Sequence, residues 1–142
     1  MNDIVIRKAT QADLNHIMDI EVSSFDETVI EDDDTYRHRI ATQVTCVAVD
    51  PSDRIVGCMV LQNKNYIASN AVLPEYRGRG ISRKMLRWVM GHANYPITLS
   101  VRSDWAHARQ LYASEGFVPV KSFASHTEHE MIEMIKSIPS IR

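Results

Sequence analysis

The chain has 142 residues, of which 44% are hydrophobic and 24% are charged, as in an ordinary globular domain. Its net charge of −2 does not favour nucleic acid as a partner, and no stretch of roughly 20 residues is apolar enough to span a bilayer. The first residues lack the basic and then apolar layout of a signal peptide. We therefore expect a single cytoplasmic domain over residues 1–142, with no nucleic-acid or membrane binding.

The first third of the chain predicts one strand and two helices. A β-rich run over 4–7 leads to Thr10, a good helix N-cap with Asp13 three residues later. The apolar residues that follow recur at helical spacing: Leu14, Ile17, Met18, Val22 and Phe25. A second, short helix is expected over 36–42, with Asp34 as its cap.

Two acidic features of this region each have two interpretations. Glu21 falls on the apolar side of the first helix, so its carboxylate lies either at the edge of the core or in the wall of a cavity. Stray charges at the boundary of an apolar stripe favour the edge. The acidic run 31–34 is either a solvated loop that starts the second helix or an electrostatic attraction for a cationic substrate.

The middle of the chain predicts a β-hairpin. Apolar runs over 45–49 and 55–61 flank a turn-rich segment. If the turn centres on Ser52, Cys46 and Cys58 lie nearly opposite each other, and a cross-strand disulfide is geometrically conceivable. For a cytoplasmic chain we favour two reduced thiols in the core.

The second half alternates strands and helices. A strand over 66–72 leads through a Pro turn and two glycines into an amphipathic helix that starts at Ile81 and stops near Gly91. The remaining expected elements are a strand over 97–101, a helix capped by Ser103 or Asp104, and strands at 117–120 and 129–136. The order β-α-α-β-β-β-α-β-α-β-β indicates an α/β (α+β) fold, with a mixed sheet and helices on its faces.

The glycine turn before Ile81 has the features of a pyrophosphate site. Two glycines spaced by one residue let a backbone lie close to a ligand and point successive N–H groups the same way. The helix start behind them adds unsatisfied N–H groups and a positive dipole end. Arg77, Arg79, Arg83 and Lys84 supply positive charge around the turn. We therefore predict that this segment binds a pyrophosphate.

Three motifs in order resemble those of the GNAT (Gcn5-related N-acetyltransferase) family, over essentially the whole chain. Residues 77–82, RGRGIS, match the family's acetyl-CoA motif of Gln or Arg, two residues, Gly, one residue, and Gly or Ala, with Ser82 as a small departure. Residues 99–117 resemble the later motif of L-x-V, A-x-x-L-Y and G-F, and residues 6–14 resemble the family's opening. The resemblance implies a mostly antiparallel sheet of about six or seven strands with a central splay, flanked by about four helices.

The resemblance also implies an N-acetyltransferase that uses acetyl-CoA as cosubstrate and no metal. An amine would attack the thioester directly, and the acetyl-CoA arm would lie in the splay between the strands 67–72 and 97–101. The expected acetyl-CoA contacts are Val72, Leu73, Arg77, Gly78, Arg79, Gly80, Ile81, Ser82 and Asp104. Tyr112 matches the family's tyrosine that acts as general acid toward the leaving thiolate, and its alternative role is a core aromatic.

Two departures from the family concern the cofactor arm and the base. Trp105 stands where the family often has an Asn that holds the arm, so that contact is either lost or shifted to Asp104. Ser100 stands where ribosomal-protein N-terminal acetyltransferases have a catalytic Glu. Glu21 is our first candidate for the base. The further candidates are a water held by Ser69, Asn70 or Ser100, and then His126 or His129.

The acceptor and the partners stay open at this point. A protein N-terminus, a lysine or a small amine fits as the acceptor, and the protein would be a monomer or a homodimer. The length and the His-Glu before the last strand resemble the ribosomal-protein alanine N-acetyltransferases. The alternative is a catalytically weak acyl-CoA-binding sensor or regulatory module. The HxxH of residues 126–129 lacks an identifiable third zinc ligand, so we expect a polar loop there.

Overall fold

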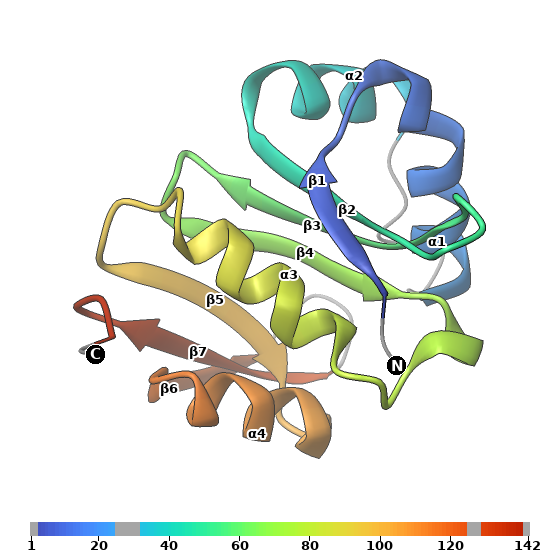
Figure 1. Ribbon diagram of the computed structural model, residues 1–142. Coiled ribbons are helices and arrows are strands. Elements are labelled where there is room, and N and C mark those ends of the chain that lie inside the picture. Colours follow the sequence, from blue (N-terminus) through green and yellow to red (C-terminus); the bar gives the residue numbers. More distant parts are fainter. Residues whose placement is uncertain (1–2, 25–31, 125–128, 141–142) are drawn as a thin grey trace.

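A computed structural model describes residues 3–24, 32–124 and 129–140 (Figure 1). The strands are β1 (Val5–Lys8), β2 (Val44–Val49), β3 (Ile55–Gln62), β4 (Tyr66–Val72), β5 (Ile97–Arg102), β6 (Val118–Ala124) and β7 (Glu130–Lys136). The helices are α1 (Leu14–Ser24), α2 (Asp33–Thr42), α3 (Ile81–Met90) and α4 (Ala106–Ser114), with short 3-10 turns at Gln11–Asp13 and Pro74–Tyr76. This order confirms the predicted one. Within the described parts of the chain, the helices are too short or too polar for a transmembrane span.

The seven strands form a single sheet in the order β1-β2-β3-β4-β5-β7-β6. Among the described residues, β4 and β5 form the one parallel pair, and the other neighbours are antiparallel. That parallel pair is short, because only Tyr66 with Thr98 and Ile67 with Leu99 are in register before the two strands diverge (Figure 1). The predicted mixed, mostly antiparallel sheet with a central splay is therefore confirmed.

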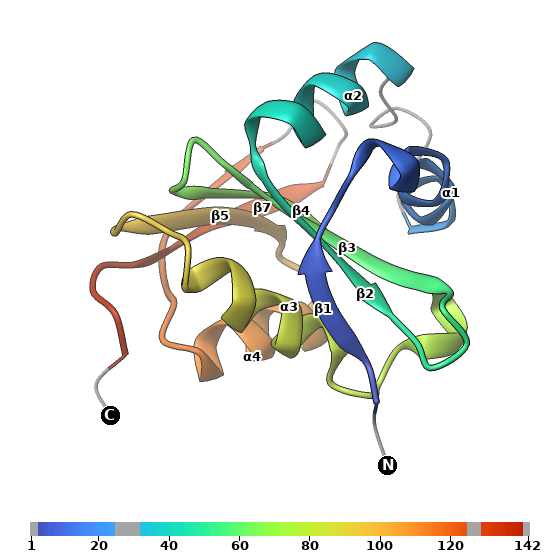
Figure 2. The same cartoon turned by 45° about the horizontal axis from the view of Figure 1, so that its top comes forward.

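Helices cover both faces of the sheet, with α1 and α2 on one face and α3 and α4 on the other (Figure 2). Each face has its own cluster of buried side chains. The cluster under α1 and α2 includes Leu14, Ile17, Ile20, Tyr36, Ile40, Val47 and Cys58. The cluster under α3 and α4 includes Cys46, Met59, Ile81, Met85, Leu86, Val89, Leu99 and Tyr112. The sheet therefore separates two cores, and each functional side chain belongs to one side or the other.

Helix α1 buries a narrower stripe than its sequence predicted. Leu14, Ile17 and Ile20 pack into the core, whereas Val22 is 58% exposed. At about 100° per residue, Val22 lies about 140° around the helix from Ile17 and points away from the sheet. The expectation for Val22 was wrong for this reason, and Phe25 lies outside the described residues.

The hairpin of β2 and β3 is confirmed, but its register separates the two cysteines. Cys46 lies opposite Met59, because an irregularity of the ladder beside Ala48 shifts the pairing by one residue. Residues that lie opposite each other point to the same face of the sheet, so Cys46 shares a face with Met59. Cys58 is the neighbour of Met59 on β3 and points to the other face, and the two cysteines therefore belong to different cores. The predicted opposition was wrong, and the favoured reading of two free, buried thiols is confirmed. Burial raises the pKa of Cys46 to about 12.

The acidic run starts helix α2 at Asp33, three residues earlier than expected. The Asp32 side chain accepts a hydrogen bond of 2.9 Å from the Thr35 backbone N–H and is the N-cap. Asp33 and Asp34 occupy the first turn, where carboxylates favour the positive end of the helix. The assignment of Asp34 as the cap was therefore wrong, because the helix begins before it.

Candidate active site

A cleft of about 1000 Å³ opens where β4 and β5 diverge. Its walls come from β4, β5, the glycine turn with the start of α3, and α4. Of the predicted acetyl-CoA contacts, those that line this cleft are Val72, Arg77, Gly78, Gly80, Ile81, Ser82 and Asp104. Leu73 and Arg79 do not line it, whereas the predicted acid Tyr112 does. The fold thus gathers most of the predicted set from separate parts of the chain into a single cleft.

The glycine turn leaves an open backbone surface beside this cleft. Gly78 and Gly80 both have φ of +78°, a conformation that costs other residues about 1–2 kcal/mol. A Cβ built at either position would meet no atom within 4 Å, so the backbone there is open to a ligand. Gly80 is the N-cap of α3, and within the described residues no side chain caps that helix. Its first N–H groups are therefore available to an anion.

Of the two arginines in the glycine turn, Arg77 lines the cleft and Arg79 does not. Arg77 donates from Nε to the Val72 carbonyl at 3.1 Å and lines the cleft. Arg79 donates to the Glu75 carbonyl at 3.0 Å, and its guanidinium lies 4.7 Å from the centre of the Tyr76 ring. The backbone therefore holds both guanidinium groups close to the turn.

The other two predicted cations, Arg83 and Lys84 of α3, bind groups of the protein itself. Lys84 donates to the Ile4 carbonyl at 2.9 Å, on the side of β1. Arg83 and Arg87 both bind the carboxylate of Glu115, which joins α3 to the end of α4. The hydrogen bond from Arg87 holds the pKa of Glu115 below its usual range. Arg83 also lines the cleft, so it can contribute positive charge there.

Tyr112 combines both of its predicted roles. Its ring is buried edge-on against Phe117, with the ring centres 5.9 Å apart. Its hydroxyl accepts a hydrogen bond of 2.8 Å from Asn70 Nδ2, and both residues line the cleft. Burial raises the pKa of this phenol, while the Asn70 hydrogen bond lowers it. A protonated hydroxyl at the wall of the cleft fits a general acid.

A polar chain that the sequence did not predict reaches Tyr112 from α3. Ser82 Oγ donates to Asn70 Oδ1 at 3.2 Å, and the nitrogen of the same amide donates to Tyr112. The three residues come from α3, β4 and α4, and all three line the cleft. The sequence signal for Asn70 was a polar residue beside Ser69 on the strand that leads to the glycine turn, and sequence analysis assigned it only to the holding of a water.

Glu21 is buried, with 4% of the residue exposed, so the favoured position at the edge of the core was wrong. Helix α1 packs against β3 and β4, and this brings the carboxylate to Ser69 of β4, whose hydroxyl donates to Oε1. Ser69 lines the cleft, but Glu21 does not. Glu21, the first candidate for the base, and Ser69, a candidate for holding a water, are therefore joined by one hydrogen bond. Burial raises the pKa of the Cys58 thiol, and the nearby charge of Glu21 raises it further.

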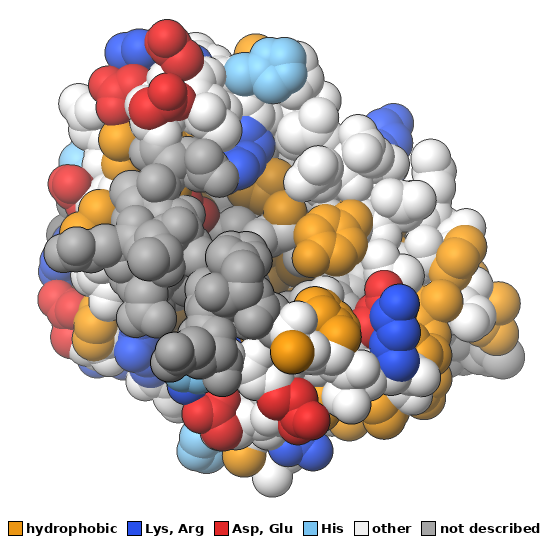
Figure 3. Space-filling model, turned by 180° about the vertical axis from the view of Figure 1, so that it is seen from behind, with side chains coloured by type: hydrophobic (Ala, Val, Ile, Leu, Met, Phe, Trp, Pro, Cys, Tyr) orange, Lys and Arg blue, Asp and Glu red, His pale blue; other side chains and the backbone are white. Residues whose placement is uncertain are grey.

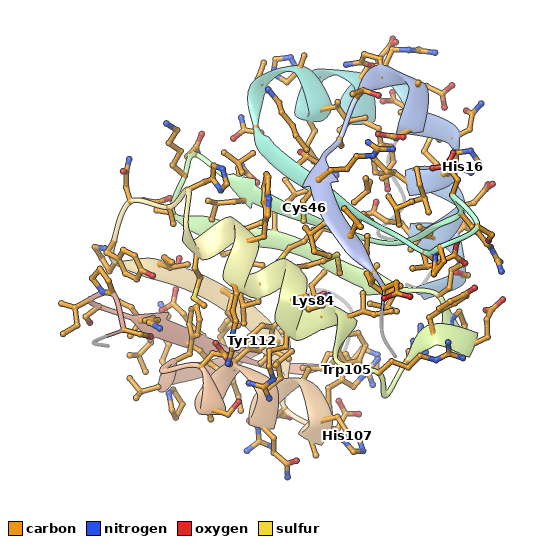
Figure 4. All side chains as sticks on the ribbon, viewed as in Figure 1. His16, Cys46, Lys84, Trp105, His107 and Tyr112 are labelled. Atoms are coloured by element: carbon orange, nitrogen blue, oxygen red, sulfur yellow. The ribbon has the colours of Figure 1, made fainter. Side chains whose placement is uncertain are left out.

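The start of α4 differs from the expected capped helix. The N-cap position is Trp105, because the Asp104 carboxylate is held by Arg102 at 2.8 and 3.0 Å. That hydrogen bond lowers the pKa of Asp104. The Arg102 guanidinium also lies 5.1 Å from the centre of the Trp105 ring, which is 41% exposed at the cleft. Ser103 and Asp104 were thus wrong as caps. Figure 4 shows Trp105 at the first turn of α4 and Tyr112 farther along it.

The weaker histidine candidates for the base receive no support. His126 lies outside the described residues, and His129 is half-buried just before β7 without lining the cleft. Among residues 3–24, 32–124 and 129–140, no three metal-ligating side chains gather in one place. Ser100, another candidate for holding a water, does line the cleft.

A comparison with protein families matches residues 13–138 to the acetyltransferase (GNAT) domain. The chain belongs to the GNAT acetyltransferase family. This confirms the resemblance that the three sequence motifs carried. No curated protein matched the chain in a sequence comparison.

Solved structures share the GNAT fold over nearly the whole chain. The ribosomal-protein-S18-alanine N-acetyltransferase of Escherichia coli is 18% identical, with a TM-score of 0.80 over 98% of this chain and 96% of its own. Arabidopsis thaliana NAA60, in complex with a bisubstrate analogue, is 18% identical, with a TM-score of 0.78 over 93% and 96%. The putative acetyltransferase yncA of Salmonella typhimurium, with its cofactor acetyl-CoA, is 17% identical, with a TM-score of 0.80 over 99% and 96%.

Proposed function

We propose that residues 1–142 act as one unit that moves an acetyl group from acetyl-CoA to a primary amine by direct attack in a ternary complex. The observation that carries this proposal is the single cleft with an open glycine cradle beside it and the Tyr112 hydroxyl in its wall. Acetyl-CoA in the Salmonella neighbour and the bisubstrate analogue bound to the Arabidopsis neighbour support it.

The donor would be held mainly by backbone groups. The pyrophosphate would bind the N–H groups of residues 78–82, with charge from Arg77 and Arg83 at the cleft. The pantetheine arm would run along β4 in the splay. The Leu73 N–H already donates to Val56 at 2.9 Å and the Val72 carbonyl accepts from Arg77, so other groups of β4 must meet the arm.

The chemistry needs one proton to leave the amine and one to reach sulfur. The amine nitrogen forms a bond to the thioester carbon, and the carbon–sulfur bond breaks. Glu21 would take the amine proton through the Ser69 hydroxyl, because the serine reaches the cleft and the carboxylate does not. Tyr112 would give its proton to the leaving thiolate. Holding both reactants in one cleft supplies much of the rate.

The acceptor would be a cationic primary amine on a peptide or a small molecule. The exposed acidic residues 32–34 lie at the start of α2, and acidic side chains gather at the top of the face seen in Figure 3. Such a patch raises the local concentration of a cationic acceptor. The Escherichia coli neighbour, an alanine N-acetyltransferase of a ribosomal protein, supports a peptide N-terminus as the first acceptor to test.

The test is release of free thiol from acetyl-CoA in the presence of a panel of N-terminal peptides, lysine peptides and small amines. Acceptor-dependent release and acetylated product by mass spectrometry are expected. Tight acetyl-CoA binding with no release for any amine in a broad panel would favour the sensor or regulatory module instead. The change from Asn to Trp105 beside the arm is the observation that favours this second candidate.

A further inference from the structure

We propose that Asn70 is a positioning residue that turns the Tyr112 hydroxyl proton toward the leaving thiolate, and that Ser82 fixes the orientation of its amide. This inference rests on the proposed role of Tyr112 as general acid. It assigns a task to a side chain that neither the glycine motif nor the tyrosine motif contains.

The direction of one hydrogen bond carries the first step. Asn70 Nδ2 donates to Tyr112 Oη at 2.8 Å, so the phenol oxygen is the acceptor. A phenol that accepts from its neighbour keeps its own proton free for another partner. Tyr112 and Asn70 both line the cleft, so a group bound there is the partner that the hydroxyl can reach. If the amide were turned over, its oxygen would accept a hydrogen bond from the phenol O–H, and the acid's proton would be occupied.

Ser82 supplies the second step, because it distinguishes the two ends of the amide. Its hydroxyl donates to Asn70 Oδ1 at 3.2 Å, which keeps the oxygen toward α3 and the nitrogen toward α4. Ser82 belongs to the first turn of α3, directly behind Gly80. The segment 78–82 would therefore bind the phosphates of the donor through its backbone, while the Ser82 hydroxyl binds Asn70, the partner of Tyr112.

The surroundings of Tyr112 leave this amide as its main polar influence. Burial raises the pKa of the phenol and Asn70 lowers it. The charged side chains near the end of α4 are engaged with Glu115. Arg83 and Arg87 bind its carboxylate, and Lys136 of β7 donates to its carbonyl at 2.6 Å. A change at Asn70 should therefore appear directly in the ionisation of Tyr112.

The decisive variant is Asn70→Asp, which keeps the shape and replaces the donor by an acceptor. The carboxylate would accept a hydrogen bond from the phenol O–H and hold its proton away from the thiolate, so we expect kcat to fall about 100-fold with little change in the KM for acetyl-CoA. In the free protein, the Tyr112 signal of ring-labelled tyrosine in NMR should titrate at a higher pH than in the unchanged chain. Tyr112→Phe identifies that signal. Asn15→Asp, the same change on the exposed side of α1, should alter neither quantity.

Two further variants test that Asn70 acts through Tyr112. In a Tyr112→Phe background, Asn70→Asp should lower kcat no further, because coupled residues are not additive. Ser82→Ala should lower kcat several-fold, and less in the presence of Asn70→Asp.

The inference is overturned if Asn70→Asp leaves the Tyr112 titration in place, or if it lowers kcat equally with and without the tyrosine hydroxyl. Failure of the proposed function gives a different result. In that case the unchanged chain transfers no acetyl group, and the NMR titration still shows whether the amide donates to Tyr112.

Discussion

The two faces of β4 are built in different ways. Ser69 points to the α1 side and is bonded to Glu21, whereas the next residue, Asn70, points to the α3 and α4 side and is bonded to Tyr112. The second face also carries the glycine turn, where Arg77, Gly78, Gly80, Ile81 and Ser82 line the cleft. The first face depends on one buried carboxylate from a helix 48 residues away in sequence.

The difference shows why the donor is easier to assign than the base. A phosphate can be held by main-chain N–H groups, and their requirement for glycine leaves a local pattern in the sequence. Proton transfer is carried out by side chains, which any packed element can supply. One wall of the cleft therefore depends on main-chain groups of a short motif, and the other depends on side chains that tertiary packing brings together.

The largest expected effect is the loss of acetyl-CoA binding at the glycine turn. Gly80→Asp forces a side chain into the left-handed region and places negative charge against phosphate. The Kd for acetyl-CoA should rise more than about 100-fold. Isothermal calorimetry measures it, with Gly80→Ala as the control for the side chain without charge. Retained micromolar affinity in Gly80→Asp, with an unchanged thermal unfolding curve, would show that the phosphate binds elsewhere.

The next effect separates chemistry from binding on the same face. Tyr112→Phe removes the hydroxyl and keeps the ring against Phe117. We expect kcat to fall about 100-fold while the Kd for acetyl-CoA stays the same. Steady-state kinetics and calorimetry measure the two quantities. Unchanged turnover would leave Tyr112 with its packing role alone.

A smaller effect tests the opposite face. Glu21→Gln keeps the size of the side chain and removes its charge, so the pH–rate profile should shift and kcat should fall roughly tenfold, since a water can still carry the proton. Acetyl-CoA affinity should not change, because Glu21 does not line the cleft. Ser69→Ala should produce the same shift. A profile that neither variant moves would favour a relay through water held by Ser100.

The smallest expected effect is a gain in acetyl-CoA affinity at Trp105. Trp105→Asn introduces the residue that the GNAT family often has, and one added hydrogen bond to the arm should tighten acetyl-CoA binding about fivefold. Calorimetry at matched salt measures it. Weaker binding would show that the exposed Trp105 ring itself contacts the donor and replaces the amide.

Local patterns predicted most of the fold. The strand over 66–72 and the helix start at Ile81 match the structure, because alternation and a glycine N-cap are local signals. The errors arose where a neighbour decided the outcome. The ladder irregularity beside Ala48 moved Cys46 away from Cys58, and Arg102 took the carboxylate of Asp104 that was expected to cap α4.

By itself, the sequence determined the family, the glycine turn and the position of Tyr112, because each depends on residues close together in the chain. Only the tertiary structure decided that Glu21 is buried against Ser69 and that Ser82, Asn70 and Tyr112 form one hydrogen-bonded chain. The physical reason is that a hydrogen bond between side chains needs atoms within about 3 Å. Sequence spacing fixes such a distance within a turn or a helix, but between elements the packing of the sheet and helices sets it.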